Sequence, residues 1–430
     1  MTYFALIPAA RSAGGREQHG HDRLRVPPWA RVAIVMFGVG WGANQFSSLL
    51  LAYRLHSGVS ESTADALFGV YALGLVPALL LIGPVSDHRG RRQIVRGAGL
   101  LSVAASLALI AGAHSPGMLY VGRFLAGACS GAAFAAGTAW IKELSLAPYD
   151  PRAGEQAGAR RAAIALSAGF GLGPLVAGLL AQWGPDPLLT AYLPHLAVML
   201  FALLMLIGAP ETVSCEARAV SLVGVLRVPS ARHDRFRGIV APAAPWVFAA
   251  PSIAFAVLPG LVIHQTGSYQ VAFGAVVAGL TLGLGVLIQP FARRLDRAGD
   301  VRGLIAGLLA VSTGTLLGAV AAGFHSWPLV LSAAALLGCG YGLCIVSGLL
   351  ETQRLARNED LASLTAIYYA LTYVGFAVPI VLAELEGIAS APVLLLLTGI
   401  LTAMSAGQVV RASARHPAVV TRLRQPTADS

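Results

Sequence analysis

The stretch GPVSDHRGRR, at residues 83–92, gathers acidic and basic side chains between two long apolar segments. Asp87 is followed closely by Arg91 and Arg92, so one carboxylate and two guanidinium groups can form charge-assisted hydrogen bonds with each other or with a helix end. Gly90 and the proline predict a tight turn. Because such contacts can be present in one conformation and absent from another, we expect a conformational latch at this turn.

A single arginine, Arg123, lies within the apolar segment at residues 117–140. A charge inside a membrane costs at least about 2.5–3.5 kcal/mol and usually faces a water-filled interior. This predicts a residue for transport or coupling. The alternative is a side chain that snorkels to the outer surface, about 5–9 Å away along the helix. We interpret His195, in another apolar segment, as a hydrogen-bonded structural residue, although histidine can also carry protons.

Polar and aromatic side chains deep in other apolar segments could bind a ligand. Asn44 and Gln45 place two neighbouring amides in hydrocarbon, where they need a substrate, water or another helix as partner. Substrate binding and hydrogen bonding between helices both remain open. Tyr341 and Tyr373 lie too far inside for the aromatic belt of a membrane surface, so we expect them at a cavity for an amphipathic ligand. Three further aromatic residues fit either the cavity or the belt: Trp246, Tyr368 and Tyr369.

Two apolar segments carry glycine at intervals of one helical turn. The residues are Gly169, Gly173, Pro174 and Gly178 in one segment, and Gly279 and Gly283 in the other. Glycine at this spacing lets two helix backbones approach closely, and a proline inside a helix bends it. We predict a helix bend and a tight interface between helices. Ordinary packing of small residues is the alternative.

Twelve apolar segments carry or flank these side chains, and each has about the 20 residues that a helix needs to cross a membrane. Only 12% of the residues are charged and 56% are hydrophobic, whereas soluble domains are about 25% charged. The sequence therefore predicts an all-α integral membrane protein. The segments are residues 32–53, 64–85, 95–113, 117–140, 161–182, 188–208, 240–263, 270–292, 302–323, 327–349, 361–383 and 390–411.

Basic residues are confined to alternate connections between the segments. All of the 30 lysine and arginine residues except Arg54 and Arg123 fall near the chain ends or after every second segment. The positive-inside rule then puts both termini in the cytoplasm. This distribution explains the net charge of +10 without a nucleic-acid partner. Arginine in place of lysine is typical of GC-rich coding, and residues 1–30 do not form a cleavable signal peptide, so we expect a bacterial inner membrane.

These motifs resemble those of the major facilitator superfamily. The turn at residues 83–92 is similar to its loop pattern G-x-x-x-D-R-x-G-R-R, with His88 in place of one arginine. The matching residues are Gly83, Asp87, Gly90, Arg91 and Arg92. YVGRFLAGACSG, at residues 120–131, and SAGFGLGPLVAG, at residues 167–178, resemble the patterns of the fourth and fifth helices. The resemblance implies twelve transmembrane helices in two pseudo-symmetric six-helix halves, with the first helix on a central cavity and the fifth and eighth helices meeting between the halves.

An internal repeat supports the resemblance. ARRLDRAG, at residues 292–299, carries Asp296 and Arg297 in the pattern of the first loop, 209 residues after Asp87. The same offset carries the start of the first segment onto the seventh and that of the fourth onto the tenth. Many transporters are built from two related halves. We therefore expect Asp296 and Arg297 to form a second latch.

The repeat divides the chain into five parts. They are a cytoplasmic N-terminal tail at 1–31, a first half at 32–208, a cytoplasmic middle loop at 209–239, a second half at 240–411 and a cytoplasmic C-terminal tail at 412–430.

The sequence favours a secondary transporter that works by alternating access. ATP-driven transport is excluded because the single lysine, Lys142, does not follow the glycine of a phosphate-binding loop. The fifth-helix pattern implies export of a small amphipathic compound in exchange for protons. Uptake of a small metabolite such as a sugar or an organic acid is the alternative, because all twenty carboxylates fall in predicted loops, tails or helix ends. A membrane sensor or assembly protein is a third reading, but the middle loop is too short for a soluble domain.

The sequence predicts no catalytic, metal or cofactor site. Its four cysteines include no CxxC pair, so we expect neither a disulfide framework nor a zinc site. The expected partners are a small-molecule substrate, protons as coupling ion and the lipid bilayer. We expect a monomer that does not bind nucleic acid.

Overall fold

The computed structural model describes residues 26–154, 157–213, 228–296, 300–357 and 361–416, and within them every regular element is helical. Eleven stretches of these residues are long and apolar enough to cross a membrane. The longest, Phe236–Ala292 with 57 residues, is interrupted by short turns between Gly260 and Tyr269 and makes two crossings. Each of the twelve predicted segments thus falls on helical structure, and the prediction of an all-α membrane protein is confirmed.

The first half contains α1 (Pro28–Ser57), α2 (Glu61–Arg89), α3 (Arg91–Ala111), α4 (Pro116–Glu143), α5 (Ala157–Trp183), α6 (Pro187–Thr190) and α7 (Leu193–Met205). The second half begins with the short turns η2 (Pro229–Arg232) and η3 (Phe236–Val240), followed by α9 (Ala241–Ser252), η4 (Ile253–Val257), η5 (Gly260–Val262), α10 (Ile263–Thr266), η6 (Gly267–Tyr269), α11 (Gln270–Leu287) and α12 (Gln289–Leu295). It ends with α13 (Arg302–Phe324), α14 (Trp327–Leu355), α15 (Leu361–Tyr373), η8 (Val374–Phe376), α16 (Ala377–Leu385) and α17 (Ala391–Arg415).

The first and last membrane helices extend into the predicted tails. α1 begins at Pro28, inside the tail predicted at 1–31, and α17 continues to Arg415, inside the tail predicted at 412–430. Proline is well suited to the first turn of a helix. Arginine can lay its apolar stem along a helix while its charge stays in water, so it does not end a membrane helix.

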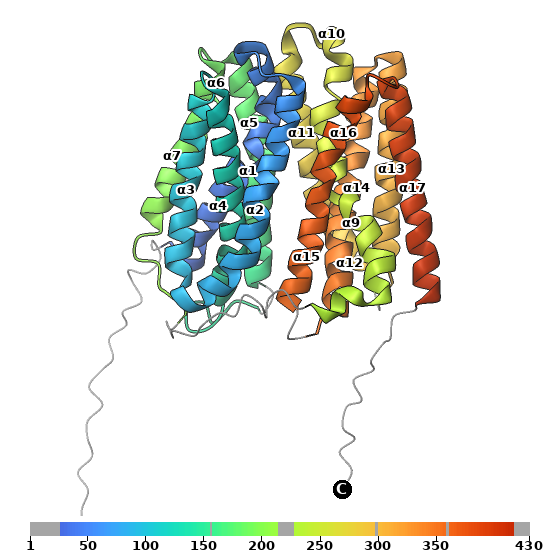
Figure 1. Ribbon diagram of the computed structural model, residues 1–430. Helices are drawn as coiled ribbons and strands as arrows, with labels where there is room; N and C mark the ends of the chain where they lie inside the picture. Colours follow the sequence, from blue (N-terminus) through green and yellow to red (C-terminus); the bar gives the residue numbers. More distant parts are fainter. Residues whose placement is uncertain (1–25, 155–156, 214–227, 297–299, 358–360, 417–430) are drawn as a thin grey trace, which may run out of the picture.

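The two halves form two helical bundles side by side, one coloured blue to green and the other yellow to red (Figure 1). Equivalent helices pack in equivalent pairs: α2 lies on α4 as α11 lies on α14, and α1 lies on α5 as α9 lies on α15. The repeat seen in the sequence is therefore a repeat of packing. We call the end of the bundle at α10 the far end, and the end where α1 begins and α17 ends the terminal end.

Close approach within these pairs depends on glycine. A Cβ atom on Gly127 would lie 2.0 Å from the carbonyl oxygen of Tyr71, so α4 touches the backbone of α2. A Cβ atom on Gly342 would lie 1.9 Å from the carbonyl oxygen of Gly285, so α14 touches α11 in the same way. A larger residue at either position would push the helices apart.

Two spans of the second half are interrupted near the bundle centre. The seventh span passes from α9, which contains Pro245 and Pro251, into the π turn η4. The eleventh span changes from α15 to α16 through η8, where a Cβ atom on Gly375 would lie 2.2 Å from the carbonyl oxygen of Pro245. These interruptions bring Phe255 and Phe376 to the boundary with the first half.

Candidate functional site

A cavity of about 420 Å³ lies between the two halves. Its walls come from α1, α2, α4 and α5 of the first half and from α9, η4, α11, α14, α15 and η8 of the second. The residues that line it are Asn44, Tyr71, Leu79, Phe134, Thr138, Leu166, Phe170, Phe248, Pro251, Phe255, Leu282, Tyr341, Ile345, Leu349, Gln353, Thr365, Tyr369, Tyr373 and Phe376.

Aromatic side chains from both halves meet at the end of the cavity that lies toward the far end. Phe68 of α2 stacks on Phe376 with ring centroids 5.7 Å apart and lies 5.7 Å from Phe255. Closer to the far end, Gln182 of α5 donates to the carbonyl oxygen of Ser268 at 2.7 Å and accepts from the backbone of Ala272 at 3.0 Å. These contacts join the halves and close the cavity on this side.

The cavity extends in the other direction toward the terminal end. Leu349 and Gln353 lie on the last two turns of α14, and Thr365 lies near the start of α15. Thr138 lies near the end of α4, which finishes at the same end of the bundle. The structure is therefore closed at the far end while its cavity reaches toward the terminal end.

The cavity wall is aromatic and uncharged. None of the described residues that line it is Asp, Glu, Lys, Arg or His. Its polar groups are the amides of Asn44 and Gln353, together with threonine and tyrosine hydroxyls. Apolar pockets with a few polar groups bind ligands that are themselves mainly apolar. Such a wall suits a flat or amphipathic molecule and offers no counter-charge to an ion.

The structure places both predicted cavity tyrosines on this wall. Tyr373 stacks against Phe248, with ring centroids 4.6 Å apart, and Tyr341 packs on the same phenyl ring at 5.9 Å. Tyr369 also lines the cavity, whereas Tyr368 donates to the carbonyl oxygen of Ile345 and packs inside the second half.

Asn44 and Gln45 point to different places. Asn44 lines the cavity, but Gln45 is fully buried and donates to the hydroxyl of Ser106 on α3 at 3.2 Å. The same hydroxyl lies 2.8 Å from Nδ1 of His195, whose other ring nitrogen is 3.1 Å from the carbonyl oxygen of Gly38. The predicted cavity role of Gln45 does not fit this position, because neighbouring residues on a helix point about 100° apart. His195 has the structural environment expected from the sequence.

Arg123 lies directly behind the cavity wall. Its guanidinium carbon is 4.5 Å from the ring centre of Tyr71 and 4.7 Å from that of Phe46. Nε donates to the carbonyl oxygen of Leu67 at 3.1 Å, and a terminal nitrogen donates to that of Ala43 at 3.4 Å. Only 2% of the residue is exposed, so the side chain does not snorkel to a surface. Arg123 instead ties α4 to α1 and α2 and supports Tyr71, which lines the cavity.

The glycine pattern of α5 serves two interfaces. Cβ atoms on Gly169 and Gly173 would lie 2.2 Å and 2.8 Å from backbone oxygens of α1, so these residues pack within the first half. A Cβ atom on Gly178 would lie 2.3 Å from the Cβ atom of Ala275 on α11, across the boundary between the halves. Gly279 of α11 faces Leu175 of α5, but Gly283 has open space beside it. The predicted interface of the fifth and eighth helices is present, with Gly178 rather than Gly169 at its contact.

Pro174 is buried inside an uninterrupted α5, which runs from Ala157 to Trp183. The helix is therefore continuous through Pro174, and the predicted bend stays a prediction.

The first predicted latch contains two carboxylates that the motif does not include. Arg91 forms an ion pair with Glu143 of α4 at 3.0 Å and donates to the hydroxyl of Ser86 at 2.5 Å. Glu211, in the PET sequence after α7, accepts from the backbone nitrogens of Arg91 and Arg92 at 2.8 Å and 2.9 Å. A carboxylate at the first turn of α3 is favourably placed against the helix dipole. The Arg92 side chain is exposed and lies outside this network.

The turn geometry of the first latch requires glycine. Gly90 has a φ of +93°, and a Cβ atom there would lie 2.6 Å from Oε2 of Glu211. Gly83 lies inside α2 and not in the turn, and its carbonyl oxygen accepts from the hydroxyl of Ser86 at 2.7 Å. The side chain of Asp87 lies outside the described residues, so its predicted role stays a prediction.

In the second predicted latch, the side chain of Asp296 is buried. Asp296 accepts from the backbone nitrogen of Gly303, at the start of α13, at 2.7 Å, and its carbonyl oxygen accepts from Arg354 at 2.6 Å. Burial raises the pKa of the Asp296 carboxyl, against the opposing effect of its hydrogen bonds. Nearby, Arg235 pairs with Glu351 at 2.6 Å. Arg297 lies outside the described residues.

The comparisons with known proteins agree with this architecture. The sequence model of the Major Facilitator Superfamily matches residues 32–378. The chain belongs to this superfamily. It is therefore a multi-pass membrane protein of a transporter family, as the sequence motifs predict.

Proteins with similar sequences include resistance proteins. The chain is 27% identical to the class C tetracycline resistance protein of Escherichia coli over 71% of its length and 75% of that protein. It is 33% identical to the multidrug resistance protein MdtL of Klebsiella pneumoniae (strain 342), but over only 20% of its length and 22% of that protein.

Solved structures of other transporters share the fold. A POT family transporter in complex with 5-aminolevulinic acid aligns with a TM-score of 0.72 over 90% of this chain and 96% of that chain, at 13% identity. A point mutant of the nucleoside transporter NupG aligns with a TM-score of 0.69 over 90% and 99% of the two chains, at 12% identity. At these identities the likeness concerns the fold alone.

Proposed function

We propose that the chain exports a small amphipathic compound in exchange for protons, by alternating access. The central observation is the uncharged aromatic cavity between the two halves, which reaches toward the terminal end. The likeness to the tetracycline resistance protein and the fifth-helix pattern favour export. With the terminal end in the cytoplasm, as the positive-inside rule predicts, a substrate would enter the cavity from the cytoplasm or the inner leaflet.

In this proposal the transport step exchanges the contacts at the two ends of the cavity. Phe68 would separate from Phe255 and Phe376, opening the far end while the halves rock about the contact of α5 with α11. Gly178 keeps that contact short enough to act as a pivot. The latches of the terminal end would form contacts that differ between the two states and so bias their populations.

Arg123 has a positioning role in the proposed cycle. Its guanidinium stays charged in a protein, so it does not release the transported proton. It holds the carbonyl oxygens of Leu67 and Ala43 and the ring of Tyr71, and it would transmit a movement of α2 to the cavity wall. Its loss should therefore impair flux through the geometry of Tyr71.

Uptake of a small metabolite is the second candidate function. The specific observation in its favour is the uncharged lining, because no described carboxylate lies in the cavity to exchange a proton with the substrate. An uncharged cavity suits a neutral molecule that moves down its own gradient.

Proton flux in inside-out vesicles tests the proposal. A pH-sensitive dye reports the gradient while lipophilic cations, antibiotics, sugars and organic acids are added in turn. Release of the gradient by an amphipathic compound, reduced about 10- to 100-fold in Arg123→Ala and partly restored in Arg123→Lys, is the expected result. No release with any compound, together with tracer uptake in whole cells, would replace export by uptake. Equal membrane insertion of the variants is the control.

A further inference from the structure

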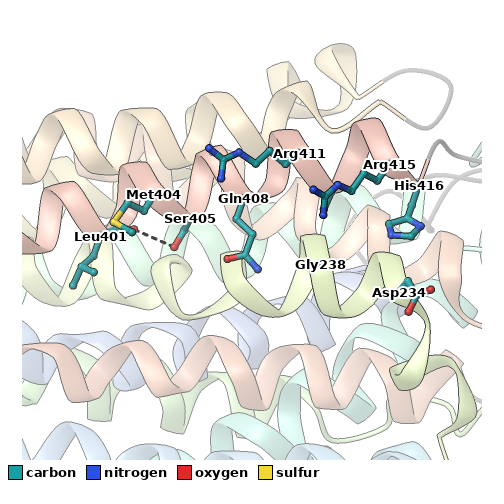
Figure 2. A pocket seen from close by; sticks show the side chains of 11 residues that line it. Asp234, Gly238, Leu401, Met404, Ser405, Gln408, Arg411, Arg415 and His416 are labelled. Carbon is teal, nitrogen blue, oxygen red and sulfur yellow. Dashed lines mark hydrogen bonds between the residues drawn. The ribbon is translucent and has the colours of Figure 1, made fainter.

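A second hollow, of about 780 Å³, lies outside the central cavity, on the second half alone. One wall is the terminal part of α17, from Leu401 to Arg415, and the other contains Asp234 and Gly238 at the start of the seventh span (Figure 2). We call this hollow the α17 groove. α17 lies at the outer edge of the bundle (Figure 1), where a transmembrane protein meets lipid.

One face of α17 changes its chemistry along the helix. Residues three or four positions apart share a helix face. On this face of α17 the residues are, in chain order, Leu397, Leu401, Met404, Gln408, Arg411 and Arg415. The three apolar side chains are exposed, as expected for a surface against hydrocarbon. From Ala391 to Arg411 the helix rises about 30 Å, roughly the thickness of a bilayer core. A helix that enters the core at Ala391 therefore brings Arg411 and Arg415 to the level of the lipid headgroups, with Gln408 about one turn deeper.

The groove is held in shape at both ends. Trp246 of α9 donates to the hydroxyl of Ser405 at 2.9 Å. At the other end Arg235 donates to the carbonyl oxygen of His416 while it pairs with Glu351 at 2.6 Å. Between these points a Cβ atom on Gly238 would lie 3.0 Å from that of Ala412, so the two walls touch at the floor.

The groove carries an excess of positive charge. Arg411 and Arg415 are exposed, and neither forms an ion pair with another residue in the part of the chain that the structure describes. Asp234 is the one carboxylate of the lining, opposite two guanidinium groups. Guanidinium groups bind phosphate through charge-assisted and often bidentate hydrogen bonds.

We propose that the α17 groove binds an anionic phospholipid of the leaflet at the terminal end. Its phosphate lies between Gln408, Arg411 and Arg415, and an acyl chain follows the exposed side chains of Leu401 and Met404. Attraction to an anionic membrane surface amounts to about 1 kcal/mol for each such arginine. The neighbouring chain segment 417–430 is a poorer occupant, because its two arginines, Arg422 and Arg424, outnumber its one acidic residue, Asp429.

A smaller hollow on the first half has the same chemistry at the same end. It measures about 300 Å³ and combines Arg92 and Arg96 of α3 with Leu203 of α7 and with Leu206 and Ile207 just after that helix. Two basic residues again lie beside apolar side chains. The Arg92 side chain lines this hollow, and its predicted latch role stays a prediction.

The test measures lipid binding to the purified full-length protein in a neutral detergent. Phosphatidylglycerol with a fluorescent acyl chain is titrated onto the wild type and onto Arg411→Gln/Arg415→Gln. The matched control is Arg152→Gln/Arg160→Gln, which removes two exposed arginines from the terminal end of the first half. We expect about 5-fold weaker binding for each groove arginine, hence about 25-fold for the pair, and no change in the control. Thermal unfolding without added lipid verifies that both variants are folded.

Three outcomes would overturn the proposal. Equal affinities of the wild type and the groove variant would show that the lipid binds elsewhere. Full competition by free sn-glycerol 3-phosphate at the concentration of the lipid would make the groove a site for a soluble phosphate. A truncation after His416 that tightens lipid binding about 10-fold would make the C-terminal segment the resident occupant.

Discussion

The two halves share one arrangement of helices but distribute their charges differently. The first half buries Arg123, in the part of α4 nearer the far end, among backbone oxygens and aromatic rings. Its terminal ion pair of Arg91 and Glu143 is partly exposed. The second half places aromatic side chains and interrupted helices at mid-bundle, and its ion pair of Arg235 and Glu351 is almost fully buried.

This difference separates a rigid half from a half suited to local movement. Buried hydrogen bonds of a charged group fix the relative positions of α1, α2 and α4. Interrupted spans with π turns and short 3₁₀ turns can adjust more easily, and such irregularities are frequent at functional sites. We infer that the first half acts as a scaffold, while η4 and η8 of the second half move the aromatic contacts that close the far end.

The largest expected effect concerns the two terminal ion pairs. Glu351→Ala leaves the positive charge of Arg235 without its partner. The side chains of Arg235 and Glu351 are 5% and 2% exposed, and breaking such a buried ion pair costs about 3–5 kcal/mol of stability. The same change at Glu143 should cost less, about 1–2 kcal/mol, because Glu143 is 32% exposed and Arg91, which is 10% exposed, keeps its hydrogen bond to Ser86. Thermal unfolding of both variants in detergent measures the difference.

A double variant distinguishes two causes of lost stability, an unpaired buried charge and a lost contact. Arg235→Met/Glu351→Met removes both charges, and replacing a buried pair by apolar side chains is often close to neutral. We expect it to recover most of the stability lost in Glu351→Ala. If Glu351→Ala and Glu143→Ala lower the unfolding temperature equally, the deeper burial of the Arg235–Glu351 pair does not make it more important for stability.

The second prediction addresses the aromatic contacts at the far end. Phe68→Ala removes two ring contacts across the halves, each amounting to about 0.5–1.5 kcal/mol. We expect about a 10-fold increase in the population open at the far end. The measure is the rate at which a membrane-impermeant maleimide, added at the far side, labels Asn44→Cys in a background without other cysteines.

A pair of rings within one half supplies the control. Phe134 and Phe170 lie 5.8 Å apart and both line the cavity, but both belong to the first half. Phe134→Ala should leave the labelling rate unchanged. Equal acceleration in both variants would mean that lost packing, rather than an opened contact between the halves, exposes the cavity.

Patterns within single segments made the fold predictable from the sequence. Helix spans, the repeat and the family follow from apolar runs, from the spacing of Asp87 and Asp296, and from glycine patterns. Tyr341 and Tyr373 could be assigned to the cavity because their depth excludes a surface belt. The helix spans and the cavity tyrosines need only the position of a residue along its own helix, and the repeat needs only one short pattern that occurs twice in the chain.

Partners that are distant in the chain were not predictable in the same way. Glu211 lies 120 residues after Arg91, and nothing in either segment specifies that they meet. Its one signal was its place in PET directly after a helix. The depth of a residue along its helix does not show which way its side chain points. Asn44 and Gln45 are neighbours on α1, but Asn44 lines the cavity and Gln45 contacts Ser106.

The smallest expected effect concerns a carboxylate at the start of a helix. Asp296 accepts a backbone hydrogen bond at the start of α13, as Glu211 does at the start of α3. Burial raises the pKa of Asp296, so the folded protein keeps this proton to a higher pH than the unfolded chain, whose pKa is about 3.9. The stability linked to this proton is full below the unfolded value and is lost as pH rises through the folded value. Asp296→Asn keeps an oxygen for the nitrogen of Gly303 but removes the titration. We expect the unfolding temperature of the variant to gain about 1–2 °C on the wild type between pH 4 and pH 7. Parallel curves over this range would show that the fold does not raise the pKa of the Asp296 carboxyl, and that its burial carries no pH-dependent stability.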